Sequence, residues 1–159
     1  FKEAKKEYGE VYLTKERSEA ERLTDAVLRN EEVVRIINKA EFEVPEIQMI
    51  DGLPFRGKAD ILKGDTIIDL KTSQDLSSFK YSCDKYSYDL QAWLYLKLFN
   101  KEKFTFLVVD KKSTDIGVFE TTKEFLARGE NKFKQAVDNY KYFFQQDNDL
   151  DQYVMRGIL

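Results

Sequence analysis

The sequence of 159 residues contains no histidine and only one cysteine, Cys83. Without histidine, the chain has no imidazole to act as a metal ligand or a general base. A lone cysteine excludes a disulfide framework and a thiolate cluster for zinc or iron–sulfur, and it favours a reducing, cytoplasmic location. No apolar run approaches the roughly 20 residues that a membrane-spanning helix needs, so we expect no membrane partner.

Proline and glycine are also scarce, with 2 and 7 residues, whereas 42% of the residues are hydrophobic and 14% are aromatic. This composition is typical of a globular domain and not of a disordered or fibrous chain. The length predicts a single domain over residues 1–159 with a buried core. The first residues, FKEAKKEYGE, form neither a signal peptide nor an initiator-methionine terminus, so we expect the domain to be truncated at its N-terminus.

The net charge of −3 is unusual for a protein that binds nucleic acid, because non-specific affinity comes from lysine and arginine neutralising phosphates. Basic residues nevertheless cluster locally, for example at Arg56 and Lys58 and along Lys123, Arg128, Lys132 and Lys134. Such a cluster is more often a solvated face than a binding site. A narrow basic channel on an acidic protein would reconcile the charge with a nucleic-acid partner.

The order of the predicted elements is α, then β, then α, without repeats. Residues 1–40 predict two or three helices, with capping-box spacing from Ser18 to Glu21. Strands are predicted at residues 42–50, 53–62 and 66–71, joined by Asp51-Gly52 and Gly64-Asp65, which suit two-residue hairpin turns. A helical block at 75–99, a buried strand FTFLVVDKK, a strand at 116–120 and a helix at 122–146 complete the prediction.

The two hairpin turns predict how the acidic residues are arranged. Counting back from two-residue turns sets Glu43 opposite Asp60, and Asp60 opposite Asp69. Because side chains alternate between faces, Lys71 would share the face of Asp69, and Arg56 and Lys58 the face of Asp60. One sheet face would then carry Glu43, Asp60, Asp69 and Lys71.

Three neighbouring carboxylates repel one another unless a cation lies between them, and oxygen ligands favour Mg²⁺ or Mn²⁺. A metal with a nearby lysine is what phosphodiester hydrolysis requires. The arrangement depends on register: a three-residue turn at Gly64 would put Asp60 and Asp69 on opposite faces, and a bulge at Pro45 would displace Glu43, with Glu46 as the alternative.

A second group of candidate residues lies on the following helix. Tyr88, Gln91 and Tyr95 are three and four residues apart and share one helical face, although such an aromatic stripe is usually core packing. The order of the motifs is rare by chance. It consists of an Asp, a short hairpin, Asp-x-Lys at a strand end and then a helix with Q-x-x-x-Y. The sequence therefore predicts a metal-dependent nuclease site.

On the segments GKADIL, IIDLKTSQDL and YDLQAWLYL, the chain resembles the PD-(D/E)XK nuclease superfamily, specifically the exonuclease VIII (RecE-type) catalytic domain of phages and prophages. The resemblance covers Glu43 to Glu120. It implies an α/β (mixed α+β) domain with a central mixed sheet flanked by helices, a restriction-endonuclease-like core. The implied activity is a Mg²⁺-dependent deoxyribonuclease that also accepts Mn²⁺, and that digests linear double-stranded DNA 5′ to 3′, leaving 3′ single-stranded tails for recombination.

The resemblance also implies a role for each candidate residue. Asp60 and Asp69 would bind the metal, with the Leu70 carbonyl as a further ligand and Glu43, or else Glu46, as the upstream acid. Lys71 would position or activate the attacking water. The substrate-positioning residues would be Gln91, Tyr95, Lys58 and Arg56.

The partners implied are double-stranded DNA ends, a single-strand annealing protein and further copies of the chain in a homo-oligomeric ring, in a bacterial or phage-infected cell. Many RecB-like relatives have a histidine before the first aspartate. Its absence here favours the RecE-like branch, or means that the N-terminal part of the site is missing. The alternatives are a non-catalytic nucleic-acid-binding module on the same fold and an endonuclease.

Overall fold

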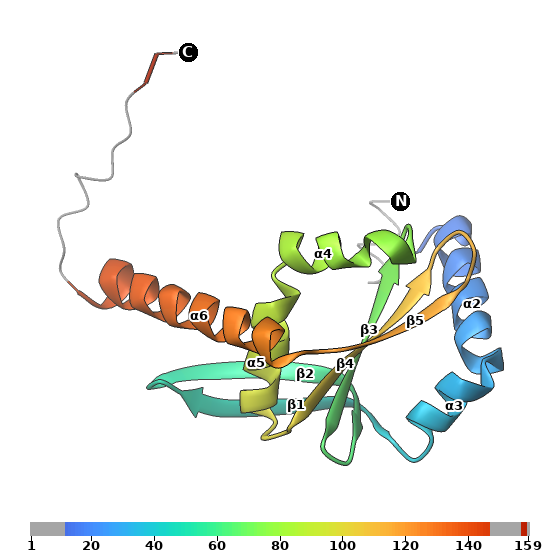
Figure 1. Cartoon of the computed structure of the whole chain (residues 1–159), viewed down its shortest axis with the longest axis horizontal. Helices are drawn as coiled ribbons and strands as arrows, with labels where there is room; N and C mark the ends of the chain where they lie inside the picture. The colour runs from blue at the N-terminus through green and yellow to red at the C-terminus, as the bar shows by residue number, and fades with distance from the viewer. Residues whose placement is uncertain (1–11, 147–156, 159) are drawn as a thin grey trace, which may run out of the picture.

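The computed structural model describes residues 12–146 and 157–158 (Figure 1). Helices α2 (Thr14–Arg29) and α3 (Glu31–Ile37) precede strands β1 (Glu41–Ile50), β2 (Leu53–Lys63) and β3 (Thr66–Ser73). The 3-10 turn η1 (Leu76–Ser78), α4 (Phe79–Lys85) and α5 (Tyr88–Leu98) lead to β4 (Lys103–Asp110) and β5 (Ile116–Glu120). Helix α6 (Lys123–Tyr140) continues into a π-helical turn η2 (Lys141–Gln145). The predicted order is confirmed, and residues 1–11 of the predicted first helical region lie outside the described residues.

The five strands form one mixed sheet in the order β1-β2-β3-β4-β5. Neighbouring strands are antiparallel except β3 and β4, which are parallel and are connected through α4 and α5. A parallel connection needs such a crossover, whereas antiparallel strands can be joined by short hairpins. The predicted fold class, a central mixed sheet flanked by helices, is confirmed.

Both predicted hairpin turns contain two residues. Ile50 pairs with Leu53 across Asp51-Gly52, and Lys63 pairs with Thr66 across Gly64-Asp65. Asp51 and Gly52 both have positive φ angles, of 50° and 78°, as a type I′ turn requires. The register on which the site prediction depends is therefore correct next to the turns.

The sheet separates two hydrophobic cores. On one side, Ile67 and Phe104 pack with residues of α4 and α5, and on the other, Ile68 packs with Val33 of α3. Figure 1 shows α5 and α6 crossing one side of the sheet, and α2 and α3 along the other. Because side chains alternate along β3, Asp69 points toward α5, on the same side as Ile67.

Three helix predictions need correction. Ser18 does not start a helix but lies inside α2, whereas Asn30 caps α3 by accepting hydrogen bonds from the amides of Glu32 and Val33. The helical block from Asp75 to Phe99 is divided, because Ser87 has a φ of 52° and redirects the chain between α4 and α5. The last predicted helix is α-helical only to Tyr140. In the described part of the chain, no helix is both long and apolar enough to cross a membrane.

Candidate active site

Asp60 lies where β2 and β3 separate. The ladder between these strands ends at the pair Ile61 and Ile68, so Asp60 and Asp69 do not form the next pair. Instead, Asp60 Oδ2 accepts a hydrogen bond of 2.9 Å from the backbone N–H of Leu70. The carboxylate of Asp60 thus occupies the fork between the two strands, next to the residue that follows Asp69.

The strand irregularity continues into β1. Phe42 pairs with Ile61 and Val44 with Ala59, but the pair predicted between them, Glu43 and Asp60, is absent from the ladder. Glu43 has a φ of 53°, in the left-handed region, and its carboxylate forms an ion pair with Lys58. Pro45 causes no slip of register.

The prediction that one sheet face carries Glu43, Asp60, Asp69 and Lys71 is wrong. Ala59 and Leu62 pack into the same core, so the alternation of β2 changes by one residue between them. Asp60 and Glu43 consequently line a cavity of about 560 Å³ between the sheet and α2. Asp69 and Lys71 lie on the α5 side, where Asp69 is still close enough to Asp60 to feel its charge.

Asp69 is the most buried of the candidate acids, with 4% of its surface exposed. Gln91 Nε2 donates a hydrogen bond of 2.7 Å to its Oδ1, and Lys71 Nζ lies 2.6 Å from its Oδ2. Among the described residues, Lys71 is the partner of Oδ2, which accepts no further hydrogen bond. Burial raises the pKa of Asp69, Lys71 and Gln91 oppose this increase, and the negative charge of Asp60 adds to it.

Lys71 is held between Asp69 and an aromatic ring that the sequence analysis assigned no role. Its Nζ lies 4.9 Å from the centre of the Tyr88 ring, at a distance typical of a cation–π contact. Tyr88 packs in turn against Phe79, Phe106 and Tyr86. Burial also raises the pKa of Tyr88. The spacing of Tyr88 and Gln91 on one helical face was the available signal for this contact.

The remaining predicted residues lie farther from Asp69. Tyr95 packs against Phe99 and Phe104, and its hydroxyl is 3.4 Å from the carbonyl of Lys58. The side chain of Lys58 forms its ion pair with Glu43, and Arg56 is exposed on β2. Tyr95 therefore supports the backbone of β2, while Asp60, Asp69, Lys71 and Gln91 come together around the fork.

The arrangement of the acidic residues indicates whether they could bind a metal ion. In the part of the chain that the structure describes, no three acidic or cysteine side chains cluster as a metal site, and Glu46 instead accepts a hydrogen bond from the amide of Ile47. Asp60 and Asp69 do fit a hard divalent cation, because both are carboxylates, Asp69 is close enough to feel the charge of Asp60, and its pKa stays raised despite the ion pair with Lys71. The Leu70 carbonyl stays a predicted third donor.

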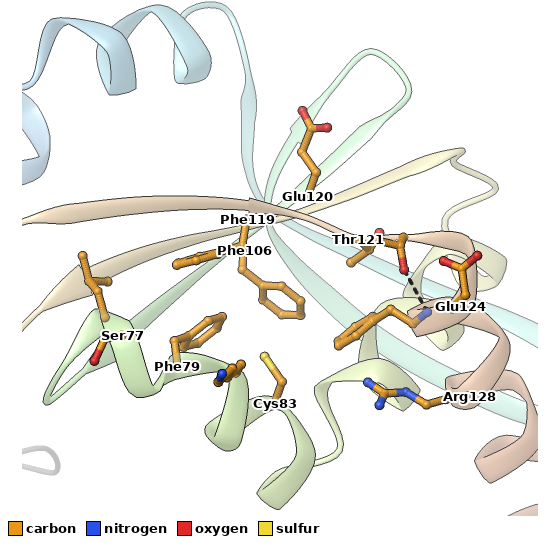
Figure 2. Close-up of a pocket in the computed structure, with 13 residues that line it drawn as sticks. Ser77, Phe79, Cys83, Phe106, Phe119, Glu120, Thr121, Glu124 and Arg128 are labelled. Carbon is orange, nitrogen blue, oxygen red and sulfur yellow. Dashed lines mark hydrogen bonds between the residues drawn. The ribbon is translucent and has the colours of Figure 1, made fainter.

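A second cavity, of about 580 Å³, lies away from these residues (Figure 2). Figure 2 shows Phe79 and Cys83 of α4 directed toward Phe119 of β5, and the start of α6 closes the far side. Thr122 caps α6 there by accepting a hydrogen bond of 3.2 Å from the amide of Phe125. This cavity contains no residue of the candidate site.

Comparison with known proteins gives one family and a set of similar folds. The model of a family described as "PDDEXK-like domain of unknown function (DUF3799)" matches residues 1–151. A structure named "putative exonuclease" from Eubacterium rectale is similar with a TM-score of 0.69 at 19% identity, over 87% of this chain. The chain spans 59% of the length of that structure.

A phage-related exonuclease from Haemophilus somnus 129PT also matches, with a TM-score of 0.48 at 15% identity, over 89% of this chain and 78% of its own. No curated protein matches the chain.

Proposed function

The chain belongs to the family of PDDEXK-like domains whose model matches residues 1–151, and from this premise we propose that it is a metal-dependent DNA exonuclease. The observation that carries the proposal is Asp69, a buried carboxylate placed between Lys71 and the fork that holds Asp60. Burying a carboxylate is costly, and Lys71 offsets this cost only in part, because the pKa of Asp69 remains raised. Ionisable groups with such unfavourable burial and a shifted pKa cluster at functional sites.

The residues around the fork have complementary roles in this proposal. Mg²⁺ or Mn²⁺, held by Asp60, Asp69 and the Leu70 carbonyl, would polarise a phosphate oxygen and supply a nucleophilic hydroxide. Gln91 fixes the orientation of Asp69 through its 2.7 Å hydrogen bond. Lys71, with its side chain 20% exposed, is close enough to solvent to orient the attacking water and to offset the charge that develops on the phosphate.

We extend the proposal to the substrate. Digestion of linear double-stranded DNA from its 5′ end, with 3′ tails left for recombination, is supported by the resemblance of the sequence motifs and by a fold similar to that of a protein named an exonuclease. We further propose that several copies of the chain form a ring and that a single-strand annealing protein is its partner. The location in this proposal is the cytoplasm of a bacterial or phage-infected cell. Arg56 and Lys58 would contact the substrate beside Asp60, and Glu43 would be the upstream acid of the metal site.

The experiment compares linear and closed circular double-stranded DNA of the same sequence in the presence of Mg²⁺, with the Asp69→Ala and Lys71→Ala variants. We expect loss of the linear DNA alone, and no loss with either variant or after chelation of the metal. Degradation from end-labelled strands then gives the polarity. Cutting of circles would establish an endonuclease instead, and DNA binding without cleavage by the folded protein would leave a non-catalytic module.

A further inference from the structure

Helix α4 has one buried side and one exposed side that is rich in tyrosine and lysine. Phe79 and Cys83 are buried and point into the core (Figure 2). On the opposite side, Tyr81 is 65% exposed, and just beyond the helix Tyr86 is 58% exposed. Both rings are therefore open to a partner from solvent. Lysines accompany both rings, with Lys80 Nζ 5.0 Å from the Tyr81 ring centre and Lys85 Nζ 5.1 Å from that of Tyr86.

This surface is continuous with the candidate active site. Tyr86 stacks on Tyr88 with ring centres 5.8 Å apart, and Tyr88 carries Lys71 over its ring. Tyr81 and Lys85 are four residues apart on α4, so their side chains are neighbours on the helix surface. We call the resulting set the lysine–tyrosine track: Lys71, Tyr88, Tyr86, Lys85, Tyr81 and Lys80.

The charge of the track is positive. The acidic neighbour on α4, Asp84, lies 3.5 Å from Arg128 of α6 in an ion pair, which reduces its effect on the lysines. The carboxylate of Asp75 is also engaged, because it accepts hydrogen bonds from the amide and hydroxyl of Ser77. Lys71 is paired with Asp69, so the positive charge of the track comes from Lys80 and Lys85. On a chain with a net charge of −3, two such lysines, each over the ring of a neighbouring tyrosine, form a local exception.

Exposed tyrosines with lysines beside them fit one partner chemistry. Single-stranded nucleic acid offers unpaired base faces that stack on aromatic rings, and phosphates between them that attract cations. In a duplex the bases are stacked on each other, so exposed rings such as Tyr81 and Tyr86 would have no bases to contact.

We propose that the lysine–tyrosine track binds a single strand of DNA that leads to or from the fork. The proposal rests on the proposed function for the origin of that strand. Tyr86 and Tyr81 stack with bases of this strand, while Lys85 and Lys80 contact its phosphates. The track therefore extends the substrate contact by about two to three nucleotides beyond the scissile bond.

The test is the affinity of the full chain for a short fluorescent oligothymidylate and for a duplex of equal length, measured by anisotropy in EDTA so that no cleavage occurs. Tyr81→Ala and Tyr86→Ala should each weaken single-strand binding by roughly 5- to 150-fold, and Tyr81→Phe and Tyr86→Phe should retain it. Lys80→Met and Lys85→Met should each reduce the slope of log affinity against log salt by about 0.7. Tyr140→Ala on α6, at another exposed tyrosine, is the matched control and should change nothing.

Unchanged single-strand affinity in the two alanine variants would overturn the inference, as would an equal loss in Tyr140→Ala or an equal loss for the duplex. The measurement is independent of catalysis. If the protein degrades linear DNA but the alanine variants bind single strands normally, the inference fails and the proposed function stands. If it binds single strands through these tyrosines but cleaves no DNA, the proposed function fails and the track stands.

Discussion

Gln91 of α5 donates a 2.7 Å hydrogen bond to Asp69 of β3, and this contact joins the helix to the most buried acid of the site. Groups that orient a metal ligand without touching the metal usually contribute a factor of about 10 to 100 in metal affinity or activity. The contact also fixes one oxygen of Asp69, while the other oxygen faces Lys71 Nζ at 2.6 Å. Helix α5 therefore contacts Asp69 through the side-chain amide of Gln91.

The first prediction concerns this amide. Gln91→Leu should lower nuclease activity by about 10- to 100-fold and raise the Mg²⁺ concentration needed for half-maximal rate, because Asp69 is no longer held in one orientation. The measurement is the rate of linear DNA loss against Mg²⁺ concentration. Gln48→Leu, at an exposed position on β1, is the control and should behave like the unmodified chain. An unchanged Mg²⁺ requirement in Gln91→Leu would exclude the orienting role.

The second prediction concerns the cost of burying Asp69. Because burial raises its pKa, the ionised form is less favourable in the folded than in the unfolded protein. Asp69→Asn should therefore unfold at a higher temperature than the unmodified chain in metal-free buffer at neutral pH, while losing activity. Mg²⁺ at 100 times its dissociation constant should stabilise the unmodified chain by about 2.7 kcal/mol and the variant little. A variant that is less stable without metal would show that the pair with Lys71 outweighs the cost of burial.

The third prediction concerns the ring beneath Lys71. Tyr88→Phe keeps the aromatic face and should retain most activity, whereas Tyr88→Leu removes it and should lower the turnover rate more than it weakens substrate binding. Steady-state kinetics of both variants separate the two parameters. Equal rates for Phe and Leu at this position would show that Lys71 is positioned by Asp69 alone.

Sequence patterns predicted the turns and the order of the strands along the chain more reliably than the geometry between strands. Asp51-Gly52 and Gly64-Asp65 determine their own turns through local φ preferences, so the register near them was predictable. The change in side-chain alternation of β2 at Asp60 was not predictable, because it arises where β2 and β3 separate and depends on packing by α2 and α5. The contact of Tyr88 with Lys71 likewise depends on the positive φ of Ser87, a residue type without a strong signal for that conformation.

A fourth prediction follows from Asp110, at the end of β4. Its carboxylate accepts hydrogen bonds from the backbone amides of Lys112, Ser113 and Leu76, and those from Ser113 and Lys112 contribute most to lowering its pKa. A carboxyl whose pKa is lower in the folded than in the unfolded protein stabilises the fold above its unfolded pKa, and this stability is lost as the pH falls toward the folded value.

Asp110→Asn should therefore be less stable than the unmodified chain at neutral pH, and the difference should shrink as the pH is lowered below about 4. Thermal unfolding across that range provides the measurement. Asp138→Asn, at an exposed position on α6, should give a difference that is small at every pH. A destabilisation by Asp110→Asn that is independent of pH would show that the shape of the turn, and not the carboxylate charge, provides the stability.

The last prediction concerns the packing that places α5, and with it Tyr88 and Gln91. Gly129 of α6 lies against the backbone of Asp89, so close that a Cβ at this position would be 2.0 Å from the Asp89 carbonyl oxygen. Asp89, 1% exposed, is also held by a 2.7 Å contact with Lys132, one turn farther along α6. In an ordinary helix interior, replacing glycine with alanine stabilises the fold by about 0.5 to 1 kcal/mol. Here the obstacle is backbone, which cannot rotate away.

Gly129→Ala should instead destabilise the protein by about 1 to 3 kcal/mol, the range for overpacking, and should lower nuclease activity by moving the first turn of α5 away from Asp69. Asn131→Ala, at an exposed position two residues along the same helix, should leave both properties nearly unchanged. Chemical denaturation and the linear-DNA assay on the two variants measure the effect. Because Asp89, Tyr88 and Gln91 share one helical turn, a stable Gly129→Ala protein with full activity would show that α6 does not control the position of the candidate site.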